Sequence, residues 1–432
     1  MLDLPRYPLR ELAASVGTPF YLYDANHLRG TLATFRRLLD ETGLAGRYSM
    51  KANSSRRVLE MVREAGLWID AASAIEVERA LAAGFPGGTD PPAIMLTTDV
   101  FRDHALALLR RHRVLPNIGS PGMVDDLVHA GYRGPVAVRV NPGFGHGHVE
   151  SCDTGGPSSK HGIWPDDLPA VRRHAEAAGL RVTGLHAHVG TGPELAEFEA
   201  NIRALVAFLE SLAPGFPDLD MINLGGGIPH QYDPSRPPLD LDAYRASLAE
   251  SVERLPRAAG RAIRIEIEPG RHLVAGMGVL VTRVCDIKST RDNVRGPGHT
   301  FVMVDAGFSD LVRAAMYGAY HHIEIAGRRA GRRAEDGAPV SCVVAGPLCE
   351  SGDVFTRSET ELLAPRLLPP PSRGDLLVLH DTGAYGASMS SNYVSMPRVP
   401  EVMWDAGGAT LISRRETMDD LVRRECTERL TL

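Results

Sequence analysis

Short hydrophobic runs alternate along much of the chain with longer stretches whose apolar positions repeat at helical spacing. The runs are typical of buried β-strands, and the longer stretches are typical of amphipathic helices. Eight strands are predicted in this part of the chain, at 47–51, 67–71, 93–97, 114–118, 136–140, 182–189, 221–224 and 263–268. Helices are predicted between them, at 56–65, 74–83, 105–113, 166–178, 194–212 and 241–255.

Regular alternation of strand and helix implies parallel strands, and eight of them indicate an α/β fold of the (β/α)8 barrel type. The runner-up is a doubly wound open sheet. After the eighth strand the pattern changes to strands joined by turns, at 278–284, 301–304, 343–345 and 376–379. We therefore expect a barrel domain over 30–275 and a second, mostly β domain formed by 1–29 and 276–432, in which the N-terminal run 18–24 contributes a strand.

Composition limits the kinds of molecule that the protein is expected to bind. Asp and Glu number 53 against 47 Lys and Arg, so the chain lacks the basic excess of a nucleic-acid-binding surface. No apolar stretch is long enough to span a membrane, and no apolar leader follows Met1. The five cysteines are scattered without a Cys-x-x-Cys pair, which argues against a disulfide framework and a structural zinc site. We expect a cytoplasmic protein that binds neither nucleic acid nor membrane.

Lys51 ends the first predicted strand, where a barrel of this type places its chemistry. Desolvation in the barrel mouth favours the neutral amine, the nucleophile that forms Schiff bases. For this residue taken alone, an ordinary surface lysine at a strand end is the simpler explanation.

Two other strand ends change that balance. Gly225, Gly226 and Gly227 follow the seventh strand, and consecutive glycines expose backbone N–H groups that can hold a phosphate. The eighth strand ends in Glu268-Pro-Gly-Arg271, which supplies a positive charge and a carboxylate able to keep a ring nitrogen protonated. A nucleophilic lysine, a phosphate loop and an acid for a pyridine nitrogen together indicate pyridoxal 5′-phosphate.

Longer motifs carry a resemblance to a known family. They are RVNPGFGHGH at 139–148, TGGPSSKHGIW at 154–164, DAGFSD at 305–310, GPLCESGD at 346–353 and DTGAYGASMSSNY at 381–393. From about Thr18 to its C-terminus the chain resembles the fold-type III pyridoxal-phosphate decarboxylases, most closely the bacterial diaminopimelate decarboxylases. The resemblance implies an alanine-racemase-like barrel, an amino-acid substrate, and conversion of meso-2,6-diaminopimelate to L-lysine and CO2.

The resemblance also implies a role for each matching residue. Lys51 would bond to the cofactor aldehyde, His188 would stack on its ring, and Glu268 would pair with its ring nitrogen. The other implied cofactor contacts are Asp70, Thr191, Gly225, Gly226, Gly227, Gly270, Arg271 and Tyr385. The implied substrate contacts are Arg271, Arg313, Tyr317, Glu350 and Tyr385.

Cys349 and Glu350 match residues that a second subunit contributes in the family. The cysteine would donate a proton after decarboxylation, and the glutamate would contact the distal amine of the substrate. The resemblance therefore implies a homodimer with shared active sites. Taken alone, Cys349 is expected to be a buried structural thiol.

Several polar residues have a second explanation. His186 shares a strand face with His188 and is expected to fill the barrel. Asp70, Glu76 and Arg139 match polar family positions near the cofactor, and a buried ion-pair network explains them equally well.

The cluster His146, His148, Cys152 and His161 lacks the spacing of a tetrahedral metal site. No metal is predicted, and the segment is expected to form a loop over the active site.

The chain departs from close relatives at a few positions. They have Ser-Asn-Tyr-Asn-Ser-Arg-Pro where residues 391–397 are SNYVSMP, so Val394 and Met396 replace an amide and an arginine beside the expected dimer-side pocket. They also have proline at Ala314 and serine at Thr191. A paralogous decarboxylase of a related diamino or D-amino acid therefore stays open, as do a racemase and an inactive regulatory homologue.

Overall fold

The chain forms two compact units. The computed structural model describes residues 1–145, 154–191, 195–237, 239–326, 337–358, 360 and 362–430. The barrel unit consists of Arg29–Gln231 and Pro237–Leu273, and the sheet unit of Met1–Leu28, Tyr232–Arg236 and Val274–Leu432. The sequence prediction keeps residues 232–236 with the barrel, whereas their contacts lie with the sheet unit.

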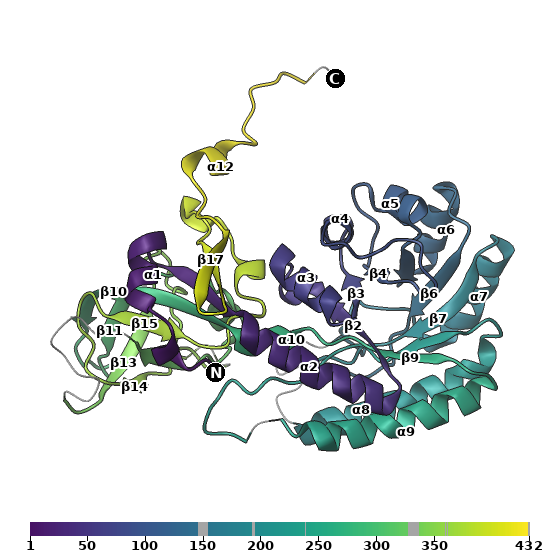
Figure 1. The fold of residues 1–432 in the computed structure, drawn as a ribbon, viewed down its shortest axis with the longest axis horizontal. Helices are drawn as coiled ribbons and strands as arrows, with labels where there is room; N and C mark the ends of the chain where they lie inside the picture. Colours follow the sequence, from purple (N-terminus) through teal and green to yellow (C-terminus); the bar gives the residue numbers. More distant parts are fainter. Residues whose placement is uncertain are drawn as a thin grey trace. The chain divides into compact units, whose positions relative to one another are not determined.

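The barrel unit contains a closed barrel of eight parallel strands (Figure 1). The last strand pairs with the first, with Glu266 opposite Ala45, so the sheet has no free edge. This confirms the predicted barrel and excludes the open doubly wound sheet. The strands are β2 (Ala45–Ser49), β3 (Trp68–Ala71), β4 (Ile94–Thr97), β5 (Leu115–Ile118), β6 (Pro135–Arg139), β7 (Arg181–His186), β8 (Met221–Asn223) and β9 (Arg264–Ile267).

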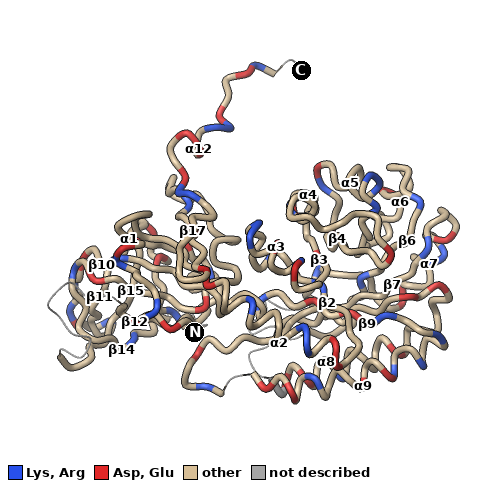
Figure 2. The backbone as a smooth tube through the Cα atoms, viewed as in Figure 1, with Lys and Arg blue, Asp and Glu red and all other residues tan. Residues whose placement is uncertain are grey.

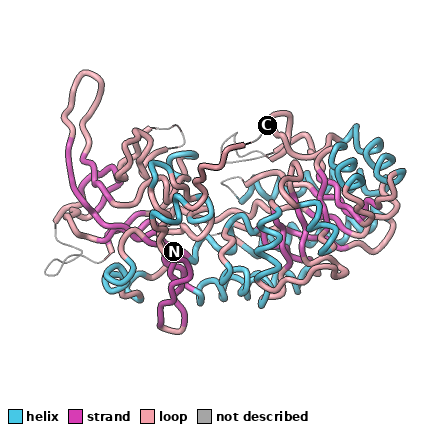
Figure 3. The backbone as a smooth tube through the Cα atoms, turned by 90° about the horizontal axis from the view of Figure 1, so that it is seen from above, coloured by secondary structure: helices cyan, strands magenta, loops and turns pink. Residues whose placement is uncertain are grey.

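Helices surround these strands, as Figure 3 shows from a second direction. They are α2 (Ala25–Thr42), α3 (Arg56–Glu64), α4 (Ala74–Ala82), α5 (Ala105–His112), α6 (Pro121–His129), α7 (Leu168–Ala177), α8 (Leu195–Leu212), α9 (Leu241–Ala259) and α10 (Arg271–Val274). The set includes every helix expected from the sequence, together with α2, α6 and α10, which the sequence analysis does not predict.

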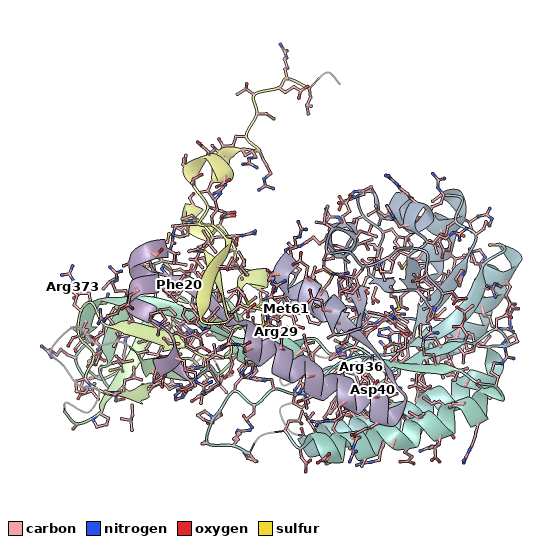
Figure 4. The ribbon with its side chains drawn as sticks, viewed as in Figure 1. Phe20, Arg29, Arg36, Asp40, Met61 and Arg373 are labelled. Carbon is pink, nitrogen blue, oxygen red and sulfur yellow. The ribbon has the colours of Figure 1, made fainter. Side chains whose placement is uncertain are left out.

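Apolar stripes and paired charges explain these helices locally. On α3, Val58, Leu59, Met61 and Val62 are buried, which is the spacing of one helical face. Figure 4 labels Met61 and also the pair Arg36–Asp40, which bonds across one turn of α2. Charges of both signs are interspersed along α8 and α9 in Figure 2. The outer faces of the helices are therefore polar, and the inner faces cover the barrel.

The sheet unit is built on one mixed sheet with strand order β14-β13-β11-β10-β1-β16-β17, to which β12 and β15 add. Its strands are β1 (Phe20–Asp24), β10 (Gly278–Ser289), β11 (Thr300–Val304), β12 (Ile323–Ile325), β13 (Val340–Ala345), β14 (Arg366–Leu368), β15 (Leu376–Leu379), β16 (Glu401–Asp405) and β17 (Gly408–Ser413). Three helices accompany them, α1 (Leu9–Val16), α11 (Arg313–Tyr317) and α12 (Met418–Val422).

The N-terminal strand holds this sheet together. β1 pairs antiparallel with β10 and parallel with β16, which confirms that the run 18–24 joins the second domain. Phe20, labelled in Figure 4, is fully buried in a cluster with Leu12, Val281 and Val378. Residues at the start of the chain therefore complete a core whose other side chains come from its second half.

Val394 adopts a strained backbone conformation. Its φ of 56° and ψ of 29° lie in the left-handed region, inside the short turn Tyr393–Ser395. A β-branched residue is a rare outlier there, whereas asparagine tolerates the region. Val394 therefore carries a backbone cost that its exposed side chain does not offset by burial.

We expect Val394→Asn to raise the free energy of unfolding by about 1 kcal/mol, because it removes left-handed strain at a β-branched residue. Thermal and urea unfolding of the variant measure this change. Val294→Asn is the matched control, since Val294 is also exposed but has no positive φ. An equal gain in both variants would mean that polarity, not strain, is responsible.

Candidate active site

The carboxyl ends of the barrel strands present polar side chains to the barrel interior. An apolar layer formed by Met95, Leu115, Ala137 and Met221 lies deeper in the barrel. Side chains two residues apart on a strand share a face, and one step beyond this layer each strand carries a polar residue. These residues are Ser49, Asp70, Thr97, Asn117, Arg139, His186, Asn223 and Glu268.

Lys51 lies at this end of the barrel, in the short turn Met50–Ala52 that follows β2. Met50 and Ala52 on either side are buried, and the Lys51 side chain between them is exposed. The prediction that burial desolvates this amine is therefore wrong, because the side chain is exposed. Lys51 lies at the predicted end of the barrel, and its charge is one of the causes that lower the Glu268 pKa.

Glu268 is an ionised carboxylate in a buried position, with an exposed fraction of 5%. It accepts hydrogen bonds from Asn223 Nδ2 at 2.8 Å and from His186 Nε2 at 3.2 Å. Burial by itself raises a carboxyl pKa, but the interactions with His186, among them its hydrogen bond, and those with His188 and Lys51 lower the Glu268 pKa to about 2. This carboxylate can hold a positive charge on a ligand.

The pKa of Asp70 shifts in the opposite direction to that of Glu268. Burial, together with the negative charge of Glu268, raises the Asp70 pKa to about 8. Ser49 Oγ donates to Asp70 Oδ2 at 3.2 Å, and Asp70 Oδ1 is buried without a partner among the described residues. Two acids in one site therefore have different charges at neutral pH, which is an arrangement typical of catalytic sites.

His188, directly after β7, is neutral. Burial, followed by the charges of Lys51 and Arg139, holds its pKa well below the ordinary value. Its Nδ1 is buried without a hydrogen-bond partner in the part of the chain that the structure describes. A neutral imidazole with an unused ring nitrogen is suited to pack its face against a flat ligand.

The glycine loop after β8 packs against backbone on both sides. A Cβ at Gly226 would lie 2.3 Å from the carbonyl oxygen of Glu268, and one at Gly227 would lie 2.2 Å from that of Gly190. Gly225 and Gly227 also have positive φ, at 69° and 95°. No other residue fits these positions, because the loop lies directly between the ends of β7 and β9.

The backbone donors of this loop are available to a ligand. Gly225 N donates to Asn223 Oδ1 at 2.8 Å, whereas the N–H groups of Gly226, Gly227 and Gly270 donate to no described residue. Gly270 packs on Ser49, and α10 starts directly after it at Arg271. Adjacent N–H groups beside an arginine form a site for an anion such as phosphate. Thr191, half-buried, follows Gly190 in the neighbouring loop.

The structure gives different roles to Glu76 and Arg139, for which the sequence left two explanations open. Glu76 accepts from Ala72 N at 2.7 Å, and its own N–H donates to the N-cap residue Ser73, so it caps α4. Arg139, by contrast, lies among the site acids: burial lowers its pKa, and the charges of Asp99, Glu268 and Asp70 oppose this shift only in part.

In the sheet unit, Arg313 is buried and held in one orientation. Its Nη1 donates to His321 Nε2 at 2.8 Å, and His321 Nδ1 donates to the carbonyl oxygen of His380 at 2.8 Å, which sets the histidine tautomer. The guanidinium also lies 4.8 Å from the ring centre of Tyr232. Tyr317 stands one turn further along α11 and is half-buried. A guanidinium fixed in this way suits a carboxylate ligand.

Cys349 and Glu350 are both exposed. The expectation of a buried structural thiol is therefore wrong, because the loop after β13 carries this cysteine at the surface. Tyr393 OH donates to Glu350 Oε2 at 3.3 Å, and its ring stacks on Phe308 at 5.3 Å. Tyr385 is half-buried with a φ of 56°.

No group of three or more His, Cys, Asp or Glu that could hold a metal ion is found among the described residues. Of the four residues in the sequence cluster, His146, His148 and Cys152 lie outside the described residues. His161 Nδ1 contacts Asp99 Oδ1 at 2.9 Å.

Comparison with known proteins identifies the family. Residues 26–275 match the model described as pyridoxal-dependent decarboxylase, pyridoxal binding domain. The chain belongs to the pyridoxal-dependent decarboxylase family. The diaminopimelate decarboxylase of Escherichia coli (strain K12) is 43% identical over 98% of this chain and 97% of the relative. A crystal structure of diaminopimelate decarboxylase has a TM-score of 0.86 and 42% identity, covering 96% of this chain and 95% of that one.

A second structure, diaminopimelate decarboxylase from Helicobacter pylori complexed with L-lysine, has a TM-score of 0.80 at 26% identity. It covers 96% of this chain and 98% of that chain. The likeness therefore extends over both units. In the described residues, no helix is long and apolar enough to cross a membrane.

The barrel unit fits the family's cofactor, pyridoxal phosphate. The N–H groups of Gly226, Gly227 and Gly270 suit its phosphate, and the buried Glu268 carboxylate suits a protonated ring nitrogen. The partnerless atoms His188 Nδ1 and Asp70 Oδ1 lie in the same site and indicate room for a further polar group.

Sequence reasoning missed Asn223 and Asn117. Both are fully buried and contact the residues of the site, Asn223 directly at Glu268 and Asn117 through His186. Their signal in the sequence was only their place at strand ends, which any turn-forming asparagine shares.

We expect Gly226→Ala to abolish tight binding of pyridoxal phosphate and to lower the free energy of unfolding by about 2 to 4 kcal/mol, because its Cβ overlaps the Glu268 carbonyl. Absorbance titration with the cofactor and urea unfolding measure the two effects. The control is Gly30→Ala on α2, where a Cβ meets no atom within 4 Å and helix propensity predicts a small gain in stability. Unchanged cofactor affinity in Gly226→Ala would contradict the assigned loop.

Proposed function

We propose that this protein decarboxylates meso-2,6-diaminopimelate to L-lysine and CO2, as a cytoplasmic enzyme of lysine biosynthesis. The observation that carries the proposal is 43% identity to a diaminopimelate decarboxylase over nearly the full length of both chains. The polar strand ends of the barrel support it, because they supply an acid, a phosphate loop and an amine at one end of the barrel.

Each part of the cofactor has a partner in this proposal. The Lys51 amine would bind the aldehyde carbon, and the Gly226, Gly227 and Gly270 N–H groups with Arg271 would hold the phosphate, with Thr191 and Tyr385 as further contacts. Bound pyridoxal phosphate supplies an electron sink for the electron pair left when the C–CO2 bond breaks.

Glu268 keeps the ring nitrogen protonated in this scheme, since an ionised carboxylate accepts a hydrogen bond from that nitrogen. His188 covers one face of the ring and excludes water from it. Asp70, protonated at neutral pH, can donate a hydrogen bond inside the site without adding a second negative charge.

The substrate would be held by its charges. Arg271, Arg313 and Tyr317 would bind carboxylate, a role that the rigid hydrogen bonding of Arg313 supports. Glu350 would contact the distal amine, and a carboxylate there disfavours a substrate whose remote end is only acidic.

A homodimer completes the proposed site. Cys349 of the partner subunit would donate its thiol proton to the carbon that has lost CO2, which replaces the lost bond with a C–H bond. The exposure of both Cys349 and Glu350 supports this, because residues that serve another subunit must stand at the surface of their own.

The second candidate is a decarboxylase of a related diamino or D-amino acid in a dedicated pathway. Val394 and Met396, which are expected beside the dimer-side pocket, favour it, as does Ala314, because all three depart from the residues expected in close relatives. A racemase or an inactive regulatory binder is disfavoured by the presence of Lys51, Glu268 and Cys349 together.

We expect the purified protein to release CO2 from meso-diaminopimelate and to form L-lysine, measured with a panel of diamino acids and chiral chromatography. Lys51→Ala should lower kcat by at least about a thousandfold, since it removes the nucleophile. Lys288→Ala, at an exposed lysine in the sheet unit, is the control. CO2 release from another panel member alone would favour the second candidate. Full turnover by Lys51→Ala would contradict both candidate functions.

Shared sites predict complementation between two inactive variants. Lys51→Ala and Cys349→Ala should each be inactive alone, and their refolded or exchanged mixture should regain about a quarter of wild-type activity through mixed dimers with one intact site. Light scattering measures the oligomeric state in parallel. Dimers that regain no activity would show that Cys349 acts within its own chain or not at all.

A further inference from the structure

Buried polar side chains form one hydrogen-bonded chain behind Glu268. Asn117 Nδ2 donates to His186 Nδ1 at 2.9 Å, which leaves the His186 proton on Nε2, and Nε2 donates to Glu268 Oε2 at 3.2 Å. From the other side, Asn223 Nδ2 donates to Glu268 Oε1 at 2.8 Å. Asn117, His186 and Asn223 are each at most 1% exposed, so water does not compete for these bonds.

Asn223 has a second task, which sets its orientation. Its Oδ1 accepts from Gly225 N at 2.8 Å, so its Nδ2 must face the carboxylates of Glu268 and, at 3.3 Å, Glu266. One side chain therefore ties the first residue of the glycine loop to the acid assigned to the ring nitrogen. The two ends of the cofactor would be held by parts of the barrel that share this amide.

Charges deeper in the barrel support the same arrangement. Glu266 is fully buried and bonds to Arg47 through both carboxylate oxygens, and to Arg264 Nε at 2.7 Å. The Arg47 and Arg264 guanidinium groups lie 4.9 and 5.3 Å from the ring centre of Trp68. Two guanidinium groups thus hold the Glu266 carboxylate, which shares the Asn223 amide with Glu268.

We propose that His186 and Asn223 are positioning residues that keep the Glu268 carboxylate ionised and in one orientation toward the cofactor's ring nitrogen. This rests on the proposed function, in its assignment of Glu268 to that nitrogen. His186 thus has a role beyond filling the barrel.

Removal of one donor should expose Glu268 to the effect of burial, which favours its protonated form. In His186→Leu we expect the dissociation constant of pyridoxal phosphate to rise by roughly 10- to 100-fold, as for loss of a hydrogen bond to a buried charge. Relative to the wild type, binding should also weaken further as the pH falls, because Glu268 without this donor takes up a proton more readily; absorbance titration at several pH values measures the difference.

Asn223→Leu should show the same pH dependence and a further loss through the glycine loop. We expect this loss to be larger for pyridoxal phosphate than for pyridoxal, which has no phosphate, whereas His186→Leu should weaken both ligands by a similar factor. The pair of ligands thus separates the two tasks of Asn223.

Two control variants distinguish a folding defect from the loss of Glu268 positioning. His186→Gln retains a side-chain N–H donor and should restore most of the affinity and the wild-type pH profile. Thr183→Val changes a buried residue of the same strand at a position that faces away from His186, and should leave binding unchanged. Thermal unfolding of every variant reports its stability independently.

Wild-type affinity and a wild-type pH profile in His186→Leu would overturn the inference, as would a His186→Gln variant as defective as His186→Leu. If the wild type binds pyridoxal phosphate but releases CO2 from no diamino acid, the proposed substrate is wrong, while the positioning of Glu268 is still measured by these titrations.

Discussion

An ionised carboxylate inside a barrel is stable only when donors and positive charges surround it, and Glu268 depends on such surroundings. Asn223 and His186 donate to it directly, and each is held in turn by a neighbour, Gly225 N for Asn223 and Asn117 for His186. Strands β5, β7, β8 and β9 must therefore keep their register for the site to exist. The closed barrel meets this requirement, because a sheet without edges cannot shift one strand by itself.

The same site separates two acids by their surroundings. Asp70 and Glu268 are both buried, yet only Glu268 receives two side-chain donors, so burial dominates at Asp70 and the donors dominate at Glu268. One acid can then stabilise a positive ring nitrogen while the other adds no charge. The glycine loop lies beside them because its residues lack side chains where the ends of β7 and β9 approach it. The close packing of the loop and the chemistry of the site thus both require the residues found at this end of the barrel.

Much of the architecture was accessible from the chain alone. The eight barrel strands agree with prediction to within a few residues, because buried parallel strands appear as short apolar runs. The strands β12, β14, β16 and β17 were missed, and β12 and β14 have only three residues each, too few to show a periodicity. Lys51, Glu268 and the glycine loop were found from their strand-end positions. Asn117 and Asn223 were not, because a single buried asparagine has no distinguishing sequence pattern.

The sequence by itself determined the fold class, the family and the identity of the residues at each strand end. These features follow from local patterns in the sequence. Only the tertiary structure decided that Lys51 and Cys349 are exposed, that Glu76 caps a helix, and that Glu268 and Asp70 carry different charges. Burial and protonation depend on neighbours far apart in the chain, such as Asn117 and His186, and barrel closure is what brings those neighbours within hydrogen-bond distance.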